Sequence, residues 1–114
     1  MKRGDLITIS VSGEYGKPRP ALVLQSDRYL PHTSILVAPI SSDVIQSRHV
    51  RILLQPSEQN GLRQTSQIMM DKIIAVPMNK TGKRIGSLDA RTMRQVNIVI
   101  PQLFGLEDEP NAAM

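Results

Sequence analysis

In the stretch GKPRPALVLQSD, residues 16–27, a proline-rich approach leads into an uninterrupted apolar run. Four apolar residues in succession, Ala21 to Leu24, are typical of a short strand that is covered on both faces. Pro18 and Pro20 fix their own φ angles, and each favours an extended backbone at the residue before it. Arg19, which stands between them, is therefore predicted to enter the strand with little backbone freedom.

Two strands are predicted to flank this one. Ile7, Ile9 and Val11 alternate with polar residues over residues 5–11 and predict a half-buried strand. The run SILVAPI, residues 34–40, predicts a third, buried strand that its proline ends or bends. The stretch VSGEYGKPRP, residues 11–20, holds two Gly and two Pro and is predicted to form a loop.

The second half of the chain is predicted to add further strands and one basic loop. Alternating apolar residues predict a fourth strand over residues 49–55, and residues 66–76 are predicted to form one or two strands with a bend near Asp71 or Lys72. Residues 77–86 are predicted as an exposed loop that holds three cations, Lys80, Lys83 and Arg84.

The apolar period changes near the C-terminus and predicts a helix over residues 89–105. Apolar residues recur there at intervals of three and four, at Met93, Val96, Ile100 and Leu103. Asp89 is predicted to cap the start and Gly105 to end the helix, while Pro101 is predicted to kink the last turn. Together the elements predict a mainly β fold, a small antiparallel barrel or curled sheet with a C-terminal α-helix packed on it.

Length and composition predict one domain. The chain has 114 residues, 40% of them apolar, which suffices for a modest core. Residues 1–106 are predicted to form that domain and the acidic residues 107–114 a disordered tail. The start of the chain lacks the apolar region of a signal peptide, and no apolar run approaches the roughly 20 residues of a membrane helix. The sequence contains no Cys, which excludes disulfides and thiolate zinc sites and fits a reducing cytoplasm.

The charge distribution suggests an anionic partner. The formal net charge is +4, and the last eight residues hold three acidic and no basic side chains, so residues 1–106 carry +7. A basic body favours nucleic acid or an acidic protein as partner, although the same charge can simply keep a protein soluble. Aromatic residues make up only 3% of the chain, so binding by base stacking on an aromatic platform is disfavoured.

Arg19 is the main candidate for chemistry, with Glu14 in the same loop and Ser41 and Ser42 directly after the third strand. A guanidinium on a restrained backbone can bind a phosphate through paired hydrogen bonds, and a nearby hydroxyl can donate to a phosphoryl oxygen. The alternatives are that Arg19 only lies in solvent at the start of a strand, without a role in chemistry, and that the serines only form a turn.

Metal and cofactor sites are not predicted. His32 and His49 lie 17 residues apart in different segments, without a metal-binding spacing, and are predicted to be surface residues. The acidic residues are too scattered for a magnesium cluster, and no phosphate-binding loop or serine nucleophile motif is present.

Several motifs together resemble the MazF/PemK (Kid-like) toxin family. They are RGDLITI at residues 3–9, E-x-x-x-x-RPALVL at residues 14–24, LVAPIS at residues 36–41, SQIMMDKIIAV at residues 66–76 and LDARTMRQV at residues 88–96. The resemblance spans residues 3–106 and implies a small SH3-like or CcdB-like barrel that forms a homodimer. It also implies the toxin of a type II toxin–antitoxin system.

The resemblance implies metal-independent, sequence-specific cleavage of single-stranded RNA, with a cognate antitoxin as protein partner and the cytoplasm as location. The 2′-hydroxyl of the RNA would attack the adjacent phosphate and leave a 2′,3′-cyclic phosphate. The implied catalytic residues are Arg19, which stabilises the phosphate charge, Ser41, which donates to a non-bridging oxygen, and Glu14, a base or base-reading group. The residues expected to bind RNA are Lys17, Ser42, Lys80, Lys83 and Arg84.

Two departures from the family pattern and one alternative remain. Many relatives have Gln after the residue that corresponds to Glu14, and Thr is commoner than Ser at position 41. Serine lacks the methyl group that restricts a threonine rotamer. The alternative is a CcdB-like toxin of the same fold that binds and poisons DNA gyrase without cutting nucleic acid, because QLFGL at residues 102–106 is loosely similar to the CcdB ending.

Overall fold

The computed structural model describes residues 1–10, 17–30, 33–46 and 50–106. The strands are β1 (Asp5–Ile9), β2 (Arg19–Val23), β3 (Ser34–Ser41), β4 (Arg51–Leu54), β5 (Ser66–Met69), β6 (Ile74–Pro77) and β7 (Thr81–Ser87). Three 3-10 turns, η1 (Asp27–Tyr29), η2 (Met70–Lys72) and η3 (Met78–Lys80), and the helix α1 (Ala90–Leu103) complete the fold. The predicted tail lies outside the described residues, and the single-domain assignment stays a prediction.

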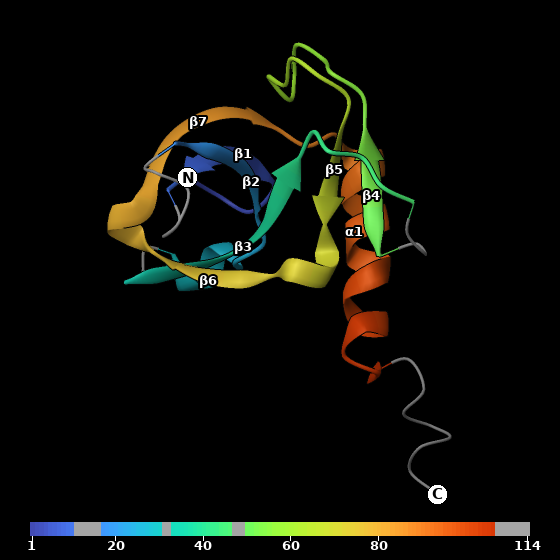
Figure 1. Ribbon diagram of the computed structural model, residues 1–114. Helices are drawn as coiled ribbons and strands as arrows, with labels where there is room; N and C mark the ends of the chain where they lie inside the picture. Colours follow the sequence, from blue (N-terminus) through green and yellow to red (C-terminus); the bar gives the residue numbers. More distant parts are fainter. Residues whose placement is uncertain (11–16, 31–32, 47–49, 107–114) are drawn as a thin grey trace, which may run out of the picture.

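The strands form one curled antiparallel sheet that is not closed within the described residues (Figure 1). The order is β4-β5-β3-β2-β1-β7, and β6 pairs with β3 beside this path. Strand β3 is central because it pairs with β6 through its first four residues and with β5 through its last two. It continues through Pro39 to Ser41, so the proline does not end it. The predicted curled sheet with a C-terminal helix is confirmed.

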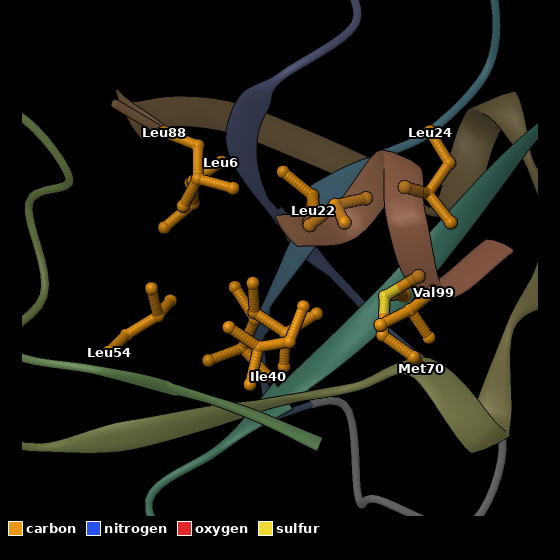
Figure 2. Packing of buried hydrophobic residues seen from close by; sticks show 12 residues of the cluster. Leu6, Leu22, Leu24, Ile40, Leu54, Met70, Leu88 and Val99 are labelled. Atoms are coloured by element: carbon orange, nitrogen blue, oxygen red, sulfur yellow. The ribbon is translucent and has the colours of Figure 1, made fainter. Parts of the chain in front are cut away.

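Two apolar clusters pack against opposite faces of the central strands. The larger cluster combines Leu6 and Leu22 with Leu54 of β4 and Val99 of α1 (Figure 2). Ile68 of β5 belongs to the same cluster. The second combines alternate residues of the same central strands with Val76 of β6. Strands β2 and β3 are therefore covered on both faces, as their continuous apolar runs predicted.

The strand predicted at the N-terminus is present as β1, but the prediction that it is half-buried is wrong. Leu6, Ile7 and Ile9 of β1 are all buried, with Leu6 in the larger cluster and the two isoleucines in the second. The reason is that β1 lies inside the sheet, between β2 and β7, where the side chains on both of its faces pack against apolar neighbours. Val11 lies outside the described residues.

Helix α1 begins after the predicted cap, Asp89, and ends just before Gly105, as predicted, while the kink at Pro101 stays a prediction. The Asp89 carboxylate accepts hydrogen bonds from the Thr92 backbone N–H at 3.2 Å and from the Thr92 hydroxyl at 2.6 Å. These bonds, the hydroxyl first among them, lower the pKa of Asp89 below its usual value. The helix includes Pro101, and Gly105 follows its end with φ +74°. Within the described residues, no helix has both the length and the apolar character needed to cross a membrane.

The predicted apolar stripe of α1 is correct only in its centre. Val96 and Val99 are buried, and Met93 and Ile100 pack at the margin of the larger cluster. Leu103 is exposed, because the helix has passed the edge of the core at that point.

The predicted basic loop over residues 77–86 is also wrong. Strand β7 occupies residues 81–87 and pairs along its length with β1. Its sequence, TGKRIGS, shows no apolar alternation, and three consecutive residues, Gly82 to Arg84, are exposed. Gly82 and Gly86 mark close backbone approaches, since a Cβ would lie 2.1 Å from Thr8 Oγ1 at the first and 2.4 Å from the Asn60 carbonyl at the second.

Other sequence predictions are confirmed. Strand β4 has Ile52 and Leu54 buried on one face, and η2 forms the predicted bend at Asp71 and Lys72 between β5 and β6. Arg51 of β4 binds Asp71 through two nitrogen–oxygen contacts of 3.2 and 3.3 Å, which tie this bend to the sheet.

Candidate functional site

Arg19 is the first residue of β2 and is exposed, while Ala21 two residues later is fully buried. In the sheet, Arg19 pairs with Ile9 of β1. The backbone of Arg19 is thus held by the sheet on one side and by the buried part of β2 that follows it. The extended, restrained presentation predicted from its two proline neighbours is confirmed.

Ser41 ends β3 at the same end of the sheet where Arg19 begins β2. The two strands are antiparallel, and Ala21 pairs with Pro39. Ala21–Pro39 is the last pair of this ladder, and Arg19 and Ser41 each lie two residues beyond it. The guanidinium and the hydroxyl therefore belong to the same end of the sheet, which we call the Arg19 edge.

The Ser41 side chain has a defined local role. Its Oγ accepts a hydrogen bond from the Asp43 backbone N–H at 3.0 Å, and the residue is half-buried. A hydroxyl that accepts one bond keeps its own hydrogen for donation to another group. Turn formation and phosphate binding, which the sequence left as alternatives, are therefore compatible at Ser41. Ser42 is exposed beside it.

The predicted RNA-binding cations lie in three different environments. Lys17 is exposed two residues before Arg19. Lys80 is exposed in η3. The Lys80 carbonyl accepts a hydrogen bond from the Ser10 N–H at 2.9 Å, so Lys80 lies at the end of β1 that is next to Arg19. Lys83 is exposed farther along β7. These lysines extend the positive charge of the Arg19 edge across β1 to β7.

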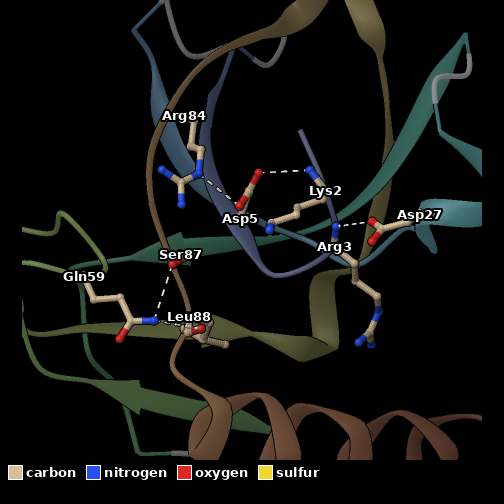
Figure 3. Close-up of polar contacts among 8 residues, drawn as sticks. All are labelled: Lys2, Arg3, Asp5, Asp27, Gln59, Arg84, Ser87 and Leu88. Carbon is tan, nitrogen blue, oxygen red and sulfur yellow. Dashed lines mark hydrogen bonds and ion pairs between the residues drawn. The ribbon is translucent and has the colours of Figure 1, made fainter.

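Arg84 differs from these lysines because it has a buried partner. Its Nε donates to Asp5 Oδ1 at 3.0 Å, and the other oxygen of Asp5 accepts from the Lys2 backbone N–H at 2.9 Å (Figure 3). Asp5 is nearly inaccessible, so Arg84 neutralises a carboxylate in the interior. Arg84 therefore has a contact within the fold in addition to any role toward a ligand.

The N-terminal motif of the sequence is an anchor for several elements. The Arg3 backbone N–H donates to Asp27 of η1 at 2.6 Å (Figure 3), and its guanidinium donates to the Leu24 carbonyl and to Asn97 of α1. Gly4 has φ +95°, in the left-handed region that favours glycine. RGD at residues 3–5 thus joins the end of β2, η1 and α1, which explains its position before the first strand.

Gln67 is a candidate site residue that the sequence did not indicate. It lies opposite Ser41 in the β3–β5 ladder and is buried. Its side-chain amide binds both backbone groups of Ile45, in the segment that follows Ser41. Two polar residues, Ser66 and Gln67, open the buried strand β5, and no local pattern in the sequence distinguishes Gln67 as a site residue.

Three predicted residues lie outside the part of the chain that the structure describes: Glu14, His32 and His49. Across residues 1–10, 17–30, 33–46 and 50–106, no three His, Cys, Asp or Glu side chains come together in a group that could hold a metal ion.

Comparison with known families shows to which family this chain belongs. Residues 2–104 match the sequence profile of the PemK-like, MazF-like toxins of type II toxin–antitoxin systems. The chain belongs to this toxin family. A protein of Mycolicibacterium smegmatis named probable endoribonuclease MazF is 33% identical over 107 residues, which is 93% of this chain and 98% of the relative. The chain is thus a MazF-like toxin with an endoribonuclease homologue.

Solved structures of MazF-like toxins share the fold. The Mycobacterium tuberculosis toxin MazF-mt6 superimposes with a TM-score of 0.76 at 27% identity, covering 90% of this chain and 97% of its own. A mycobacterial endoribonuclease in complex with its cognate antitoxin superimposes with a TM-score of 0.77 at 17% identity, covering 93% and 96%. The open sheet with one C-terminal helix is therefore the fold of MazF-like toxins.

Proposed function

We propose that this MazF-like toxin is a sequence-specific endoribonuclease that cuts single-stranded RNA without a metal ion. The observation that carries the proposal is the placement of Arg19 and Ser41 at the same end of adjacent strands, on a basic edge of the sheet. In the reaction, the 2′-hydroxyl gives its proton to a base, its oxygen forms a bond to the adjacent phosphorus, and the bond to the 5′-oxygen breaks as that oxygen takes a proton from water. The products are a 2′,3′-cyclic phosphate and a 5′-hydroxyl.

Arg19 stabilises the charge that builds on the phosphoryl oxygens. A planar guanidinium can hold two of these oxygens through charge-assisted hydrogen bonds, and its restrained backbone lowers the entropy lost on binding. A charged donor that is in place before the reaction stabilises the transition state without a reorganisation cost. Arginine remains protonated at neutral pH, so this electrostatic role suits it better than that of a general acid.

Ser41 donates its hydroxyl hydrogen to a non-bridging oxygen of the same phosphate. The bond that its Oγ accepts from Asp43 supports this role, because it orients the hydroxyl and leaves its hydrogen available. Ser42, exposed next to it, is a second contact for the RNA. Glu14 is proposed as the base that takes the proton of the 2′-hydroxyl, or as a residue that reads a base of the RNA.

The exposed cations supply affinity for the RNA backbone. Lys17, Lys80 and Lys83 are proposed to contact phosphates on either side of the scissile one, and Arg84 to contribute through the part of its side chain that stays exposed. Such contacts release counterions, so the affinity should fall as the salt concentration rises.

The cognate antitoxin is proposed as the natural inhibitor, with the toxin acting as a homodimer in the cytoplasm. A solved relative is in complex with its cognate antitoxin, and dimerisation would double the positive surface. We propose an antitoxin with an acidic segment that is disordered when free and covers the Arg19 edge when bound. Competition between that segment and a cleavage-resistant RNA analogue is the test, and a stable ternary complex with RNA still at Arg19 would contradict occlusion.

Gyrase poisoning is the second candidate. The observation that favours it is the exposure of Leu103, Phe104 and Leu106 at the end of α1, where CcdB-like toxins end in a similar sequence. The family match over residues 2–104 favours RNA cleavage instead.

Incubating the purified protein with single-stranded RNA in EDTA, and in parallel with DNA gyrase and supercoiled DNA, separates the two functions. RNA fragments with cyclic phosphate ends are expected in the first assay. Intact RNA together with trapped gyrase cleavage complexes would contradict the proposal.

A further inference from the structure

We propose that Gln67 is a positioning residue that holds the segment after β3 and thereby orients the Ser41 hydroxyl. The inference rests on the proposed RNA-cleaving function, because it assigns Gln67 a part in the same reaction. It concerns a residue of β5 that does not itself contact the substrate.

The contacts of Gln67 resemble the pairing of an additional strand. Its Oε1 accepts from the Ile45 backbone N–H at 3.2 Å, and its Nε2 donates to the Ile45 carbonyl at 2.6 Å. Only 6% of Gln67 is exposed, whereas Ile45 is 45% exposed, so the amide reaches from the interior to a segment at the surface and both bonds are partly buried. The side chain therefore fixes the backbone of Ile45 over β5.

This contact restrains the short segment between Ser41 and Ile45 at both ends. Ser41 pairs with Gln67 in the β3–β5 ladder, and Ile45 is held by the Gln67 amide. Between these two points the Asp43 N–H reaches Ser41 Oγ at 3.0 Å. The position of the Asp43 N–H thus depends on an anchor two residues later in the chain.

The orientation of Ser41 is the property that this anchor controls. A serine lacks the methyl group that restricts the χ1 angle of threonine, so a neighbouring hydrogen bond must select its rotamer. The bond from Asp43 does so and leaves the hydroxyl hydrogen for the phosphate. Loss of the Gln67 amide should let the segment move and the Ser41 hydroxyl rotate.

Burying an amide lowers the stability of a protein relative to burying an apolar side chain, unless the amide makes its hydrogen bonds. Here both polar groups of Gln67 are bonded, and both partners belong to the segment next to Ser41. What the amide contributes beyond packing is therefore the placement of that segment.

Asn60 provides a matched control. It is also 6% exposed, and its amide binds the Gln55 carbonyl and the backbone N–H groups of Ser57 and Leu62. Both residues are thus buried amides that fix the backbone of a connecting segment. The bonds of Asn60 stay within residues 55–62 and do not involve Ser41.

The experiment compares Gln67→Met with Asn60→Leu, with Gln67→Leu as a second variant if the methionine variant does not fold. Three quantities are measured at a temperature where each protein is folded: amide hydrogen exchange, the Kd for an RNA with a 2′-deoxy scissile nucleotide, and the single-turnover cleavage rate. Gln67→Met should speed exchange at the Ile45 N–H and lower the cleavage rate about tenfold or more, with Kd changed less than about twofold. Asn60→Leu should cleave at the wild-type rate.

A rescue variant tests the rotamer argument. Adding Ser41→Thr to Gln67→Met supplies the missing rotamer restriction and should recover part of the lost rate. The inference is overturned if Gln67→Met cuts RNA at the wild-type rate, if Asn60→Leu loses as much activity, or if threonine gives no recovery. A wild-type protein that cuts no RNA would instead refute the proposed function itself.

Discussion

Arg84 and Asp5 form an ion pair that joins β7 to the buried start of β1, with Arg84 Nε 3.0 Å from Asp5 Oδ1. The Arg84 side chain is 54% exposed and the Asp5 side chain only 3%. A surface cation therefore neutralises an interior carboxylate. Besides its backbone pairing with β1, the edge strand β7 is therefore held to the sheet by this ion pair.

Replacing Arg84 with Ala should lower the free energy of unfolding by about 1 kcal/mol. The buried Asp5 loses a charge-assisted bond, while solvent screening of the exposed arginine keeps the effect at the low end of the usual range. Urea unfolding measures the change. Lys83→Ala, an exposed neighbour on β7, is the control and should alter stability by less than about 0.5 kcal/mol. Equal stability of both variants would show that the ion pair contributes nothing.

Gly82→Ala should destabilise the protein because the new Cβ would lie 2.1 Å from Thr8 Oγ1 on the adjacent strand. The next nearest atoms, Thr8 Cβ at 3.5 Å and its carbonyl oxygen at 3.6 Å, leave ordinary contact distances. Adding Thr8→Ala removes the clashing hydroxyl and should restore most of the lost stability. Thermal unfolding of the single and double variants provides the measurement, and an additive loss in the double variant would contradict the packing argument.

Asp89→Ala should cost about 1 kcal/mol at neutral pH, as expected for the loss of an N-terminal helix cap. The bonds from Thr92 lower the pKa of the folded-state carboxylate below the ordinary 3.8. A lowered folded-state pKa means that this stabilisation is complete above the ordinary pKa and is lost as the pH falls through the folded-state value. The stability difference between wild type and Asp89→Asn, measured by urea unfolding, should therefore shrink below about pH 3.8. A difference that grows on acidification would contradict the direction of the shift.

Lys83→Ala should weaken RNA binding without slowing the chemical step. For single-stranded RNA, each lost phosphate contact reduces the slope of log K against log salt by about 0.7. Titrations of a 2′-deoxy RNA analogue at several salt concentrations give that slope. An unchanged slope would place Lys83 outside the RNA-binding surface.

The central strands could be predicted from sequence because their composition matches their environment. The continuous apolar runs of β2 and β3 require cover on both faces, and the prolines around Arg19 dictate an extended entry to β2. The α1 start was predictable from Asp89, whose capping role depends only on its own side chain and the next turn.

The remaining features depend on neighbours that the sequence does not show. Strand β7 shows no apolar period because it is an edge strand that pairs with β1 and exposes Gly82 to Arg84, so its sequence was predicted to form a basic loop. The contact of Gln67 with Ile45 crosses 22 residues and follows from the sheet register rather than from a local pattern.

The most direct test of the account is cleavage of single-stranded RNA by the Arg19→Ala variant in EDTA, with the wild type and Arg19→Lys beside it. The wild type should yield 2′,3′-cyclic phosphate ends, and a 2′-deoxy scissile nucleotide should abolish the cut. Arg19→Ala should remain folded and lose about a hundredfold or more in rate, and lysine should not restore it because a point charge cannot replace the planar guanidinium. A folded Arg19→Ala protein that cuts at the wild-type rate would contradict the assignment of this sheet edge as the catalytic site.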